Sequence, residues 1–419
     1  MPSISVHHEH ESRDDQPFLG YRVGSHEYHL IEGGLFIAAF VTFGQLYAIQ
    51  VLLPKISDYF SIPPVTASLA VSMTTAALAV ALFFAGPLSE RIGRRPVIVG
   101  SIIATSLVGM LIGFAPVWPV LLAGRILQGF MLAGLAAVAA AYLAEEIHPL
   151  DLPRSTGLYV AGTGLGGLAG RLASGLLSNF VSWNWTLSII GTVGLVMALI
   201  AWRMLPKQRG FVRTGATISV MYHNMGRIMR EPALVLLFVT AALALGAYQA
   251  IFNMTPYRLT GEPYLLATWM VSGIYLVNLA GSWSAMAAGS LAGRFGRRTV
   301  LPISGLLALA GILITLASPL WLILVGILIF AIGFFGIQSV AAGFVASRAR
   351  SGVGAVGQAS SLYSVSYYAG GSLFGTLAGV AWSATGWGGV ALLCATLVLA
   401  LIGVSMLLRR IPPLTPDGR

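Results

Sequence analysis

The stretch Gly86-Pro-Leu-Ser-Glu-Arg-Ile-Gly-Arg-Arg95 returns later in the chain as Gly289-Ser-Leu-Ala-Gly-Arg-Phe-Gly-Arg-Arg298. Six of the ten positions are identical, and the copies stand 203 residues apart in a chain of 419. A weaker echo at a shift of 204 relates Leu158-Tyr159 to Leu362-Tyr363. A repeat at about half the chain length predicts two like halves.

The composition excludes a soluble protein. Hydrophobic residues make up 57% of the chain and charged residues only 9%, whereas a soluble domain carries roughly 25% charged residues. A mean hydropathy of +0.83 and 50 glycines indicate many membrane-spanning helices. Soluble enzymes, nucleic-acid modules and disordered scaffolds are therefore excluded, and no nucleic-acid partner is expected. The single cysteine, Cys394, excludes an intrachain disulfide and a multi-cysteine metal site.

Twelve apolar runs are long enough to cross a bilayer, which takes about 20 residues. Because lipid-exposed backbone must satisfy its own hydrogen bonds, we expect an all-α protein with twelve transmembrane helices. The runs cover 31–54, 65–86, 96–115, 118–143, 155–178, 186–205, 233–257, 265–288, 299–317, 320–345, 356–380 and 387–408.

The runs divide into a six-helix bundle at 31–205 and a second at 233–410, joined by a cytoplasmic linker at 206–232. Polar tails are expected at 1–30, which we predict to be disordered, and at 411–419. No cleavable signal peptide is expected, because the start of the chain lacks an apolar segment.

Two polar segments lie outside the twelve apolar runs. The segment Thr217 to Arg230 has the pattern of a basic amphipathic helix lying on the inner leaflet. His7, His8 and His10 could bind a metal, but nothing fixes their geometry, and we interpret them as part of a solvated tail. No metal and no cofactor are expected.

Cationic residues are distributed unevenly between the two sides of the predicted membrane. If both termini are cytoplasmic, 20 of the 24 Lys and Arg residues lie in cytoplasmic segments and only Lys55 and Arg258 lie outside. The remaining two, Arg125 and Arg171, lie within helices. The positive-inside rule therefore predicts cytoplasmic termini and an even number of spans. We expect a monomer in a bacterial inner membrane.

Both decapeptides fall in the turn between the second and third helix of a half. Gly86 and Gly289 would let two helices approach closely, and Gly93 and Gly296 would permit a tight reversal. Glu90 can pair with a neighbouring arginine, whereas its counterpart Gly293 cannot. We predict that this turn and two acids near it act as a conformational switch. The predicted switch residues are Gly86, Glu90, Arg91, Gly93, Arg94, Arg95, Glu145, Glu146, Gly289, Arg294, Gly296 and Arg297.

The decapeptide resembles the signature of the major facilitator superfamily, G-x-L-a-D-r-x-G-r-k-x-x-l, with Glu90 in place of Asp. A second motif of that family, l-x-x-R-x-x-q-G, is matched by Leu122, Arg125, Gln128 and Gly129. The glycine-rich antiporter motif of the fifth helix is matched in part, because Arg171 replaces its proline and Ser174 one of its glycines. The resemblance covers 31–410 and implies a twelve-span alternating-access carrier similar to bacterial efflux carriers. It also implies that Arg125 takes part in proton coupling and helix–helix hydrogen bonding.

An ionisable residue inside a span is costly, so each is a functional hypothesis. Arg125 and Arg171 lie in the outer half of the first bundle, and Gln128 shares a helix face with Arg125. None of the 14 acids and no histidine falls at mid-membrane. Buried cations without a buried anion favour an anionic or neutral polar substrate. A structural tie for Arg125 and snorkelling for Arg171 are the alternatives.

Polar and aromatic residues within the helices mark the expected cavity lining, because amides and tyrosines supply directional hydrogen bonds. The alternative is hydrogen bonding between helices. The predicted substrate-binding residues are Gln50, Arg125, Gln128, Arg171, Gln249, Asn253, Asn278, Gln338, Tyr363 and Tyr367, with Gln45, Tyr47, Tyr248, Tyr275 and Ser366 as further lining candidates.

The function expected is secondary-active transport of a small polar or anionic solute, by proton-coupled export. Glu145 and Glu146 are the candidates for coupling, since they lie near the turn with Arg91 and Arg94; a static ion pair is the alternative. Import by symport, multidrug export and a non-transporting receptor remain open. An enzyme is not expected, because no helix holds a histidine or a mid-span acid.

Overall fold

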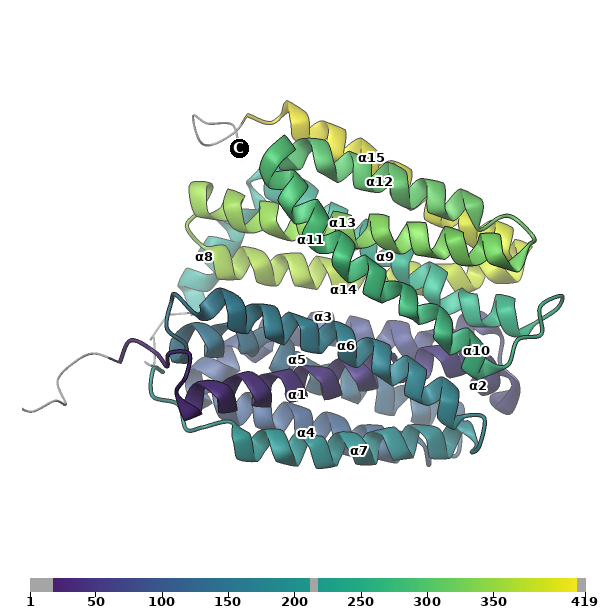
Figure 1. Cartoon of the computed structure of the whole chain (residues 1–419), viewed down its shortest axis with the longest axis horizontal. Coiled ribbons are helices and arrows are strands. Elements are labelled where there is room, and N and C mark those ends of the chain that lie inside the picture. Colours follow the sequence, from purple (N-terminus) through teal and green to yellow (C-terminus); the bar gives the residue numbers. More distant parts are fainter. Residues whose placement is uncertain (1–17, 212–217, 413–419) are drawn as a thin grey trace, which may run out of the picture.

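The computed structural model describes residues 18–211 and 218–412, and within them it is helical apart from one isolated β-bridge between Tyr21 and Ile147. Figure 1 shows two helical bundles lying side by side, the first built from α1 to α7 and the second from α9 to α15. The predicted all-α fold with two halves is confirmed.

The first bundle runs from residue 26 to residue 204. Its elements are α1 (His26–Ala48), η1 (Ile49–Leu52), α2 (Leu53–Phe60), α3 (Pro64–Ile92), α4 (Arg94–Ile112), α5 (Trp118–Glu146), α6 (Leu152–Leu177) and α7 (Trp183–Met204). Short 3₁₀ helix η1 joins α1 to α2 without an intervening loop. The three elements therefore form one rod.

The second bundle follows the linker helix α8 (Ile218–Met229), which lies within the segment predicted to be amphipathic. Its elements are α9 (Pro232–Thr260), α10 (Thr268–Gly273), η2 (Ile274–Leu276), α11 (Val277–Phe295), α12 (Arg297–Ile314), α13 (Leu320–Gly352), α14 (Val356–Thr385) and α15 (Trp387–Arg410). Here α10, η2 and α11 form one rod, so each half has six rods and each predicted run falls on one of them.

Nine of the described helices are long and apolar enough to cross a membrane by composition alone. The rods that fall short are α6, α14 and the broken rod α10–α11. These three lie between the halves, where α6 contacts α10 and α14 contacts α3. Their glycine, serine and threonine content lowers their hydropathy, because a helix that faces another helix or a polar site need not match lipid.

Glycines bring the helices of each half together in the same way. A Cβ atom on Gly170 would overlap the carbonyl oxygen of Gly44, and one on Gly166 would overlap the backbone of Phe40. In the second half, a Cβ on Gly370 would overlap the backbone of Ala242. The pairs α1–α6 and α9–α14 therefore pack backbone to backbone, as small residues allow in membranes.

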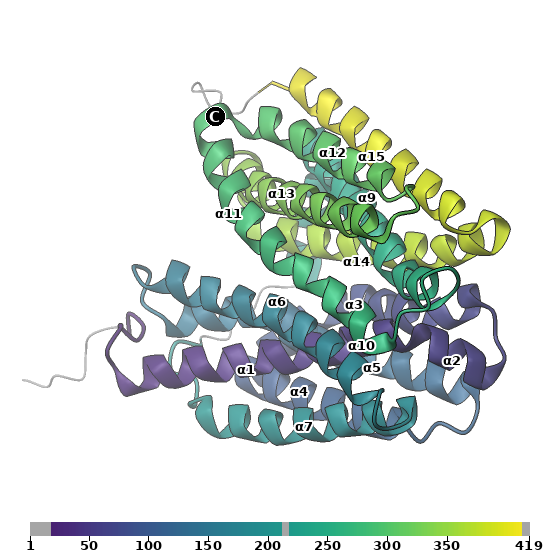
Figure 2. The same cartoon turned by 45° about the vertical axis from the view of Figure 1, so that its right-hand side comes forward.

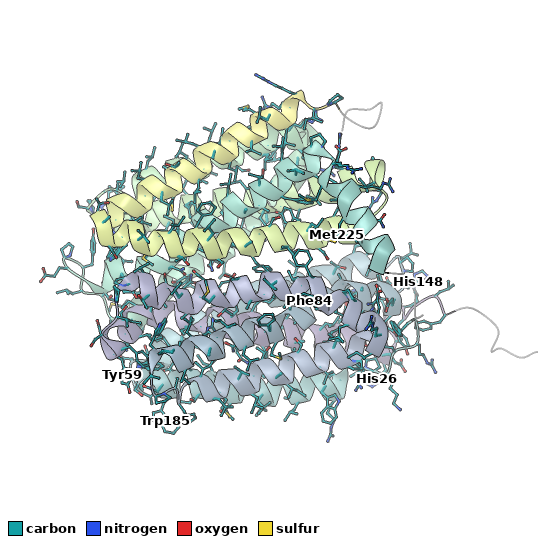
Figure 3. All side chains as sticks on the ribbon, turned by 180° about the vertical axis from the view of Figure 1, so that it is seen from behind. His26, Tyr59, Phe84, His148, Trp185 and Met225 are labelled. Atoms are coloured by element: carbon teal, nitrogen blue, oxygen red, sulfur yellow. The ribbon has the colours of Figure 1, made fainter. Side chains whose placement is uncertain are left out.

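Both described chain ends lie at one end of the bundles, which we name the terminal side; the other end is the opposite side. In Figure 3, His26 and His148 mark the terminal side, and Tyr59 and Trp185 mark the opposite side. On the opposite side the halves touch through η1, α2 and α9 and through α6 and α10. Figures 1 and 2 show α11 diverging from α6 toward the terminal side. The halves are thus closed together on the opposite side.

The expected disordered tail is shorter than predicted, because residues 18–30 are ordered. Helix α1 begins at His26, capped by the Ser25 hydroxyl, which accepts from the Tyr28 amide. Upstream of it, the Tyr21 amide donates to Glu146 O over 2.7 Å, and the His148 amide donates to Tyr21 O over 3.0 Å. The expectation is therefore wrong for 18–30. The histidine cluster at 7–10 lies outside the described residues.

Candidate functional site

Arg171 of α6 lies at the centre of the surface between the two halves. Its Nε donates to Gln50 Oε1 over 2.8 Å, and its Nη1 donates to Gly167 O over 3.0 Å. The guanidinium stacks over the Tyr47 ring at 4.1 Å and over the Tyr275 ring at 4.8 Å. Arg171 is thus held by α1 on one side and by the second half on the other, and its charge is offset by two aromatic faces.

Gln50 continues this network across the boundary between the halves. Its Nε2 donates to Asn253 Oδ1 over 2.6 Å and approaches Gln249 Oε1 at 3.5 Å. In the same region the Tyr248 hydroxyl donates to Asn278 Oδ1 over 3.3 Å. The structure therefore brings five of the predicted residues into one cluster, which we name the central polar cluster. Its members are Gln50, Arg171, Gln249, Asn253 and Asn278, with Tyr47, Tyr248 and Tyr275 around them.

Buried polar atoms of this region lack hydrogen-bond partners among the described residues. They are Arg171 Nη2, Gln249 Nε2, Asn253 Nδ2 and Ser72 Oγ. Arg171 is 3% exposed, and the other three residues are fully buried. A Cβ atom on Gly375 would lie 3.1 Å from Ser72 Oγ and 3.2 Å from Asn253 Nδ2, so these two atoms surround one point on α14. Three of the four atoms are N–H donors, and the hydroxyl can also donate.

Arg125 does not join the central polar cluster. Its Nε donates to Ala70 O and its Nη2 to Leu46 O, both over 2.8 Å, while its Nη1 donates to Gln45 O and to Gln128. The helix turns from α to 3₁₀ geometry at Ile49, and the guanidinium binds carbonyls just before this change. Arg125 therefore ties α1 to α3 and α5 inside the first half.

Gln128 has the same internal position. Its Nε2 donates to Gln45 Oε1 over 3.1 Å and to Thr105 O over 3.2 Å. A small cavity of about 10 Å³ lies beside it, which is room for about one water molecule. The structure thus places the predicted pair Arg125 and Gln128 next to a water-sized space and away from the surface between the halves.

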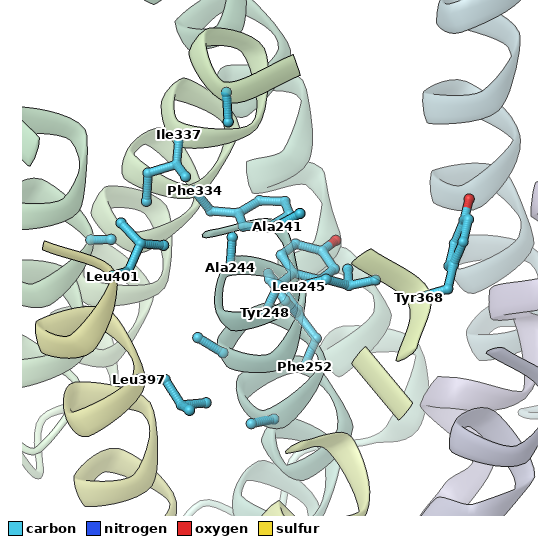
Figure 4. Close-up of a cluster of buried hydrophobic side chains, with 14 of the residues drawn as sticks. Ala241, Ala244, Leu245, Tyr248, Phe252, Phe334, Ile337, Tyr368, Leu397 and Leu401 are labelled. Carbon is cyan, nitrogen blue, oxygen red and sulfur yellow. The ribbon is translucent and has the colours of Figure 1, made fainter. Parts of the chain in front are cut away.

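Four tyrosines lie between the central polar cluster and the terminal side; we name them the tyrosine patch. They are Tyr159 of α6 and Tyr363, Tyr367 and Tyr368 of α14. The Tyr363 and Tyr367 rings stack at 6.3 Å and 14°, and Tyr368 meets Tyr367 edge-on at 5.3 Å. Figure 4 shows Tyr248, Phe252 and Phe334 packed together, with Tyr368 standing apart toward the first bundle. Tyr159 and Tyr367 are half-buried, whereas Tyr363 and Tyr368 are buried.

Gln338 of α13 is half-buried and lies outside both groups, with no hydrogen bond in the described part of the chain. Ser366 of α14 is likewise half-buried. Neither residue contacts the central polar cluster through a hydrogen bond.

The two glycine turns have the backbone that the decapeptides predicted. Gly93 has φ +101° and Gly296 has φ +86°, a region that favours glycine. The expected close approach at Gly86 and Gly289 is wrong for this structure, since a Cβ on Gly86 would meet nothing within 4 Å and one on Gly289 only Ser339 Oγ at 3.5 Å. The reason is that α3 and α11 pack on their neighbours through other positions.

The ion pair at the first turn joins Arg94 to Glu145, with Nη2 and Oε1 3.0 Å apart. Arg94 Nη1 also donates to Ser89 Oγ over 2.6 Å, and Arg95 Nε caps α7 at Leu205 O over 2.8 Å. Glu90 and Arg91 form no ion pair among the described residues. The expected pairing of Glu90 is therefore wrong here, because Arg94 points toward α5 and Arg91 toward the exterior.

The second half distributes its charges differently. Arg297 stands at the repeat position of Arg94, and Arg348 at that of Glu145, since 145 plus 203 gives 348. Two arginines cannot pair, and Arg348 instead binds Glu231 at 2.7 Å and the carbonyl of Pro412 at 2.8 Å. Arg294 lies over the Phe295 ring. The repeat position of Arg348 was visible in the sequence, but its partner was not.

Glu146 anchors the linker to the first half. Its Oε1 accepts from the backbone amides of Arg209 and Gly210, each over 2.9 Å, and the residue is fully buried. Nearby, Arg22 binds Asp151 at 3.0 Å. The segment before α1 and the linker therefore both attach to the region where α5 ends.

A contact that the sequence analysis missed closes the opposite side. The Tyr257 hydroxyl lies 2.7 Å from Ser57 Oγ and donates to Leu53 O over 3.0 Å. It joins α9 of the second half to α2 of the first. The chain separation of 204 between Leu53 and Tyr257 matches the repeat shift and is the one signal that could have suggested the pair.

Comparisons with known proteins agree with this architecture. A family model described as Major Facilitator Superfamily matches residues 35–283. The chain is 40% identical to "Inner membrane transport protein YnfM" of Escherichia coli over 94% of each chain. It is 36% identical to "Uncharacterized MFS-type transporter YybF" of Bacillus subtilis, over 95% of this chain and 98% of the relative.

Among solved structures, the chain resembles a bacterial homologue of the human lysosomal transporter Spinster in an inward-facing, unoccupied conformation. The TM-score is 0.72 and the identity 16%, over 92% of this chain and 95% of the other, so the likeness concerns the fold. The relatives are named as transporters, which agrees with the expectation of a protein that is not an enzyme. This chain belongs to the major facilitator superfamily of membrane transporters.

Proposed function

We propose that this transporter moves a small polar or anionic solute by alternating access and that the solute binds at the central polar cluster. The observation that carries the proposal is the group of buried, unpartnered donors around Arg171, Gln249 and Asn253. A buried donor without a partner costs about 1–3 kcal/mol. A solute with acceptor oxygens would recover that free energy on binding.

The charge around the cluster supports an anion over a cation. Among the described residues Arg171 has no carboxylate partner, and the three ion pairs found there all lie at the terminal side. The Tyr47 and Tyr275 rings beside Arg171 already hold the guanidinium. A cationic solute would therefore meet an uncompensated positive charge.

We assign the terminal side to the cytoplasm of a bacterial inner membrane. The excess of Lys and Arg on that side supports this orientation, and the relative named as an inner membrane transport protein supports the membrane. The closed opposite side then corresponds to an inward-facing conformation. In that conformation a solute reaches the cluster from the cytoplasm, which is the direction in which an exporter loads.

Proton coupling is proposed at Glu145 and Glu146. Glu145 pairs with Arg94, and Glu146 holds the linker through Oε1 while its Oε2 has no hydrogen-bond partner among the described residues. Protonation of either carboxyl would loosen a contact between α5 and its surroundings, and such a change could bias one half against the other.

The test uses the purified chain in proteoliposomes with an imposed pH gradient. A panel of labelled carboxylates, amino acids, sugars and cationic dyes is offered, and accumulation is followed in both orientations. We expect an anionic or neutral polar solute to move in the direction opposite to the proton flow. We expect this flux to be lost in Arg171→Gln. Preferred transport of quaternary ammonium dyes would refute the substrate class, and uptake in the direction of the proton flow would show symport instead of export.

For coupling, Glu145→Gln and Glu146→Gln are compared with Glu90→Gln, whose carboxylate forms no ion pair in the described part of the chain. We expect the solute flux to lose its dependence on the pH gradient in Glu145→Gln or Glu146→Gln. Glu90→Gln should retain the flux. Unchanged coupling in both would exclude these acids.

A further inference from the structure

The central polar cluster and the tyrosine patch lie one after the other along the membrane axis. On α14, Tyr367 precedes Gly375 by eight residues, or about 12 Å along a helix. Gly375 marks the point near Ser72 Oγ and Asn253 Nδ2, and the patch lies nearer the terminal side. The polar donors are thus gathered nearer the opposite side, and the aromatic rings nearer the terminal side.

The patch has rings with free hydroxyls. In the described part of the chain, no protein group forms a hydrogen bond with the hydroxyl of Tyr159, Tyr363, Tyr367 or Tyr368. None of these oxygens belongs to the buried, unpartnered atoms, so each keeps contact with accessible space. Three of the four tyrosines lie on α14, where their rings contact one another, while Tyr159 of α6 packs against the core of the first half. The α14 tyrosines therefore offer flat apolar faces with polar rims.

The separation of the central polar cluster from the tyrosine patch distinguishes between classes of anionic solute. A sugar acid carries hydroxyls around its whole ring and would need amides along its whole length. Here only the central polar cluster supplies amides, whereas the tyrosine patch next to it is aromatic. A small aliphatic acid would fill the polar end and leave the rings unused. A carboxylate attached to a planar aromatic ring matches both zones, because rings pair with tyrosines in offset or edge-on geometry.

We propose that the solute is an aromatic carboxylate, with its carboxylate at Arg171, Gln249 and Asn253 and its ring against Tyr367 and Tyr363. This inference rests on the proposed function, since it names the substrate class of the same site. Binding from the terminal side would leave the ring nearer that side and place the carboxylate toward the closed opposite side.

The experiment measures binding to the purified full chain in lipid nanodiscs by calorimetry. The probes are benzoate, cyclohexanecarboxylate, glucuronate and benzyl alcohol. Cyclohexanecarboxylate matches benzoate in size and charge but lacks the aromatic ring, and benzyl alcohol keeps the ring but lacks the charge. We expect the affinity for benzoate to be at least about fivefold higher than that for each of the other probes. This factor corresponds to the free energy of one aromatic pair.

Two variants assign the zones. Arg171→Gln should abolish binding of both acids, whereas Tyr367→Leu should weaken benzoate about fivefold and leave cyclohexanecarboxylate unchanged. Tyr59→Leu, on the opposite side, is the matched control, and thermal unfolding confirms that each variant is folded. Equal affinity for benzoate and cyclohexanecarboxylate, or tighter binding of glucuronate, would overturn the aromatic assignment and leave the proposed anion site intact. Failure of every acid together with binding of cationic dyes would overturn the proposed function itself.

Discussion

Gln50 and Asn253 hold the two halves together through a hydrogen bond of 2.6 Å, and they stand 203 residues apart in the chain. That separation equals the shift of the repeated decapeptide, so the two amides occupy the same position in the two halves. Equivalent positions can touch only where the halves meet about their common axis. The pair therefore marks the pseudo-symmetry axis of the transporter, and Arg171 lies directly beside it.

A double-mutant cycle tests this contact. Gln50→Leu removes a partner from both Asn253 and Arg171, while Asn253→Leu affects Gln50 alone. We expect each single change to lower the free energy of unfolding by about 1–3 kcal/mol, with the larger effect for Gln50→Leu. The double variant should lose less than the sum, since the Gln50–Asn253 contact is lost only once. Thermal unfolding in micelles measures the effect, and simple additivity would show that the contact is absent.

The Tyr257 hydroxyl is predicted to hold the opposite side closed. Tyr257→Phe removes its contacts with Ser57 and Leu53 and should shift the conformational equilibrium toward the form open on the opposite side. The expected shift is about fivefold, from a loss of about 1 kcal/mol. Spin labels at positions 59 and 262, in a Cys394→Ala background, report the distance between the halves.

Tyr264→Phe is the control for that measurement, because its hydroxyl donates to Ser318 O within the second half. It should leave the distance distribution unchanged. An equal shift in both variants would mean that loss of any tyrosine hydroxyl on this side loosens the structure in general.

Gly170→Ala should destabilise the first half. A methyl group there would overlap the carbonyl oxygen of Gly44, whereas one on Gly164 of the same helix would meet nothing within 4 Å. Overpacking of this kind costs about 1–3 kcal/mol, while alanine in a free helical position gains about 0.8–1 kcal/mol over glycine. We expect a lower melting temperature for Gly170→Ala and an equal or higher one for Gly164→Ala. Similar melting temperatures would contradict backbone packing of α1 on α6.

Arg125→Lys tests the clamp on α1. A lysine ammonium cannot reach Ala70 O and Leu46 O together as the planar guanidinium does. We expect a loss of about 1.5–3 kcal/mol in the free energy of unfolding, the scale of a hydrogen bond to a charged group. Arg22→Lys serves as the control, since the Arg22 side chain is 59% exposed and an exposed ion pair contributes about 0–1 kcal/mol. Equal effects in both variants would exclude a structural clamp at Arg125.

The Arg94–Glu145 pair should stabilise the terminal end of the first half. Glu145→Gln leaves Arg94, whose side chain is only 10% exposed, without a carboxylate partner, because its other contacts, Ser89 Oγ and the Phe211 ring, carry no charge. We expect the melting temperature to fall and Arg94→Gln/Glu145→Gln to recover part of the loss, because the double variant buries no unpaired charge. A double variant less stable than both single variants would contradict this reasoning.

The fold class, the two halves and the twelve rods could be predicted from the sequence, because apolar length, glycine content and the repeated decapeptide are local or periodic features. The sequence also predicted the positive φ of Gly93 and Gly296, since a tight reversal before a helix needs a residue without a Cβ atom. The two arginines within the helices could also be identified from the sequence, because a charged residue inside a membrane span is costly and therefore rare.

Which of those charges lies at the central polar cluster depends on the packing of the whole molecule. Arg125 and Arg171 look alike in the sequence, and they are separated only by what their helices face: α5 turns Arg125 toward the carbonyls of α1 and α3, while α6 turns Arg171 toward the second half. The partners of Arg348 and Tyr257 were also undecided, because each side chain can reach several neighbours. Contacts between residues about 200 positions apart depend on how whole helices pack, and that packing is a property of the assembled halves and not of any one segment.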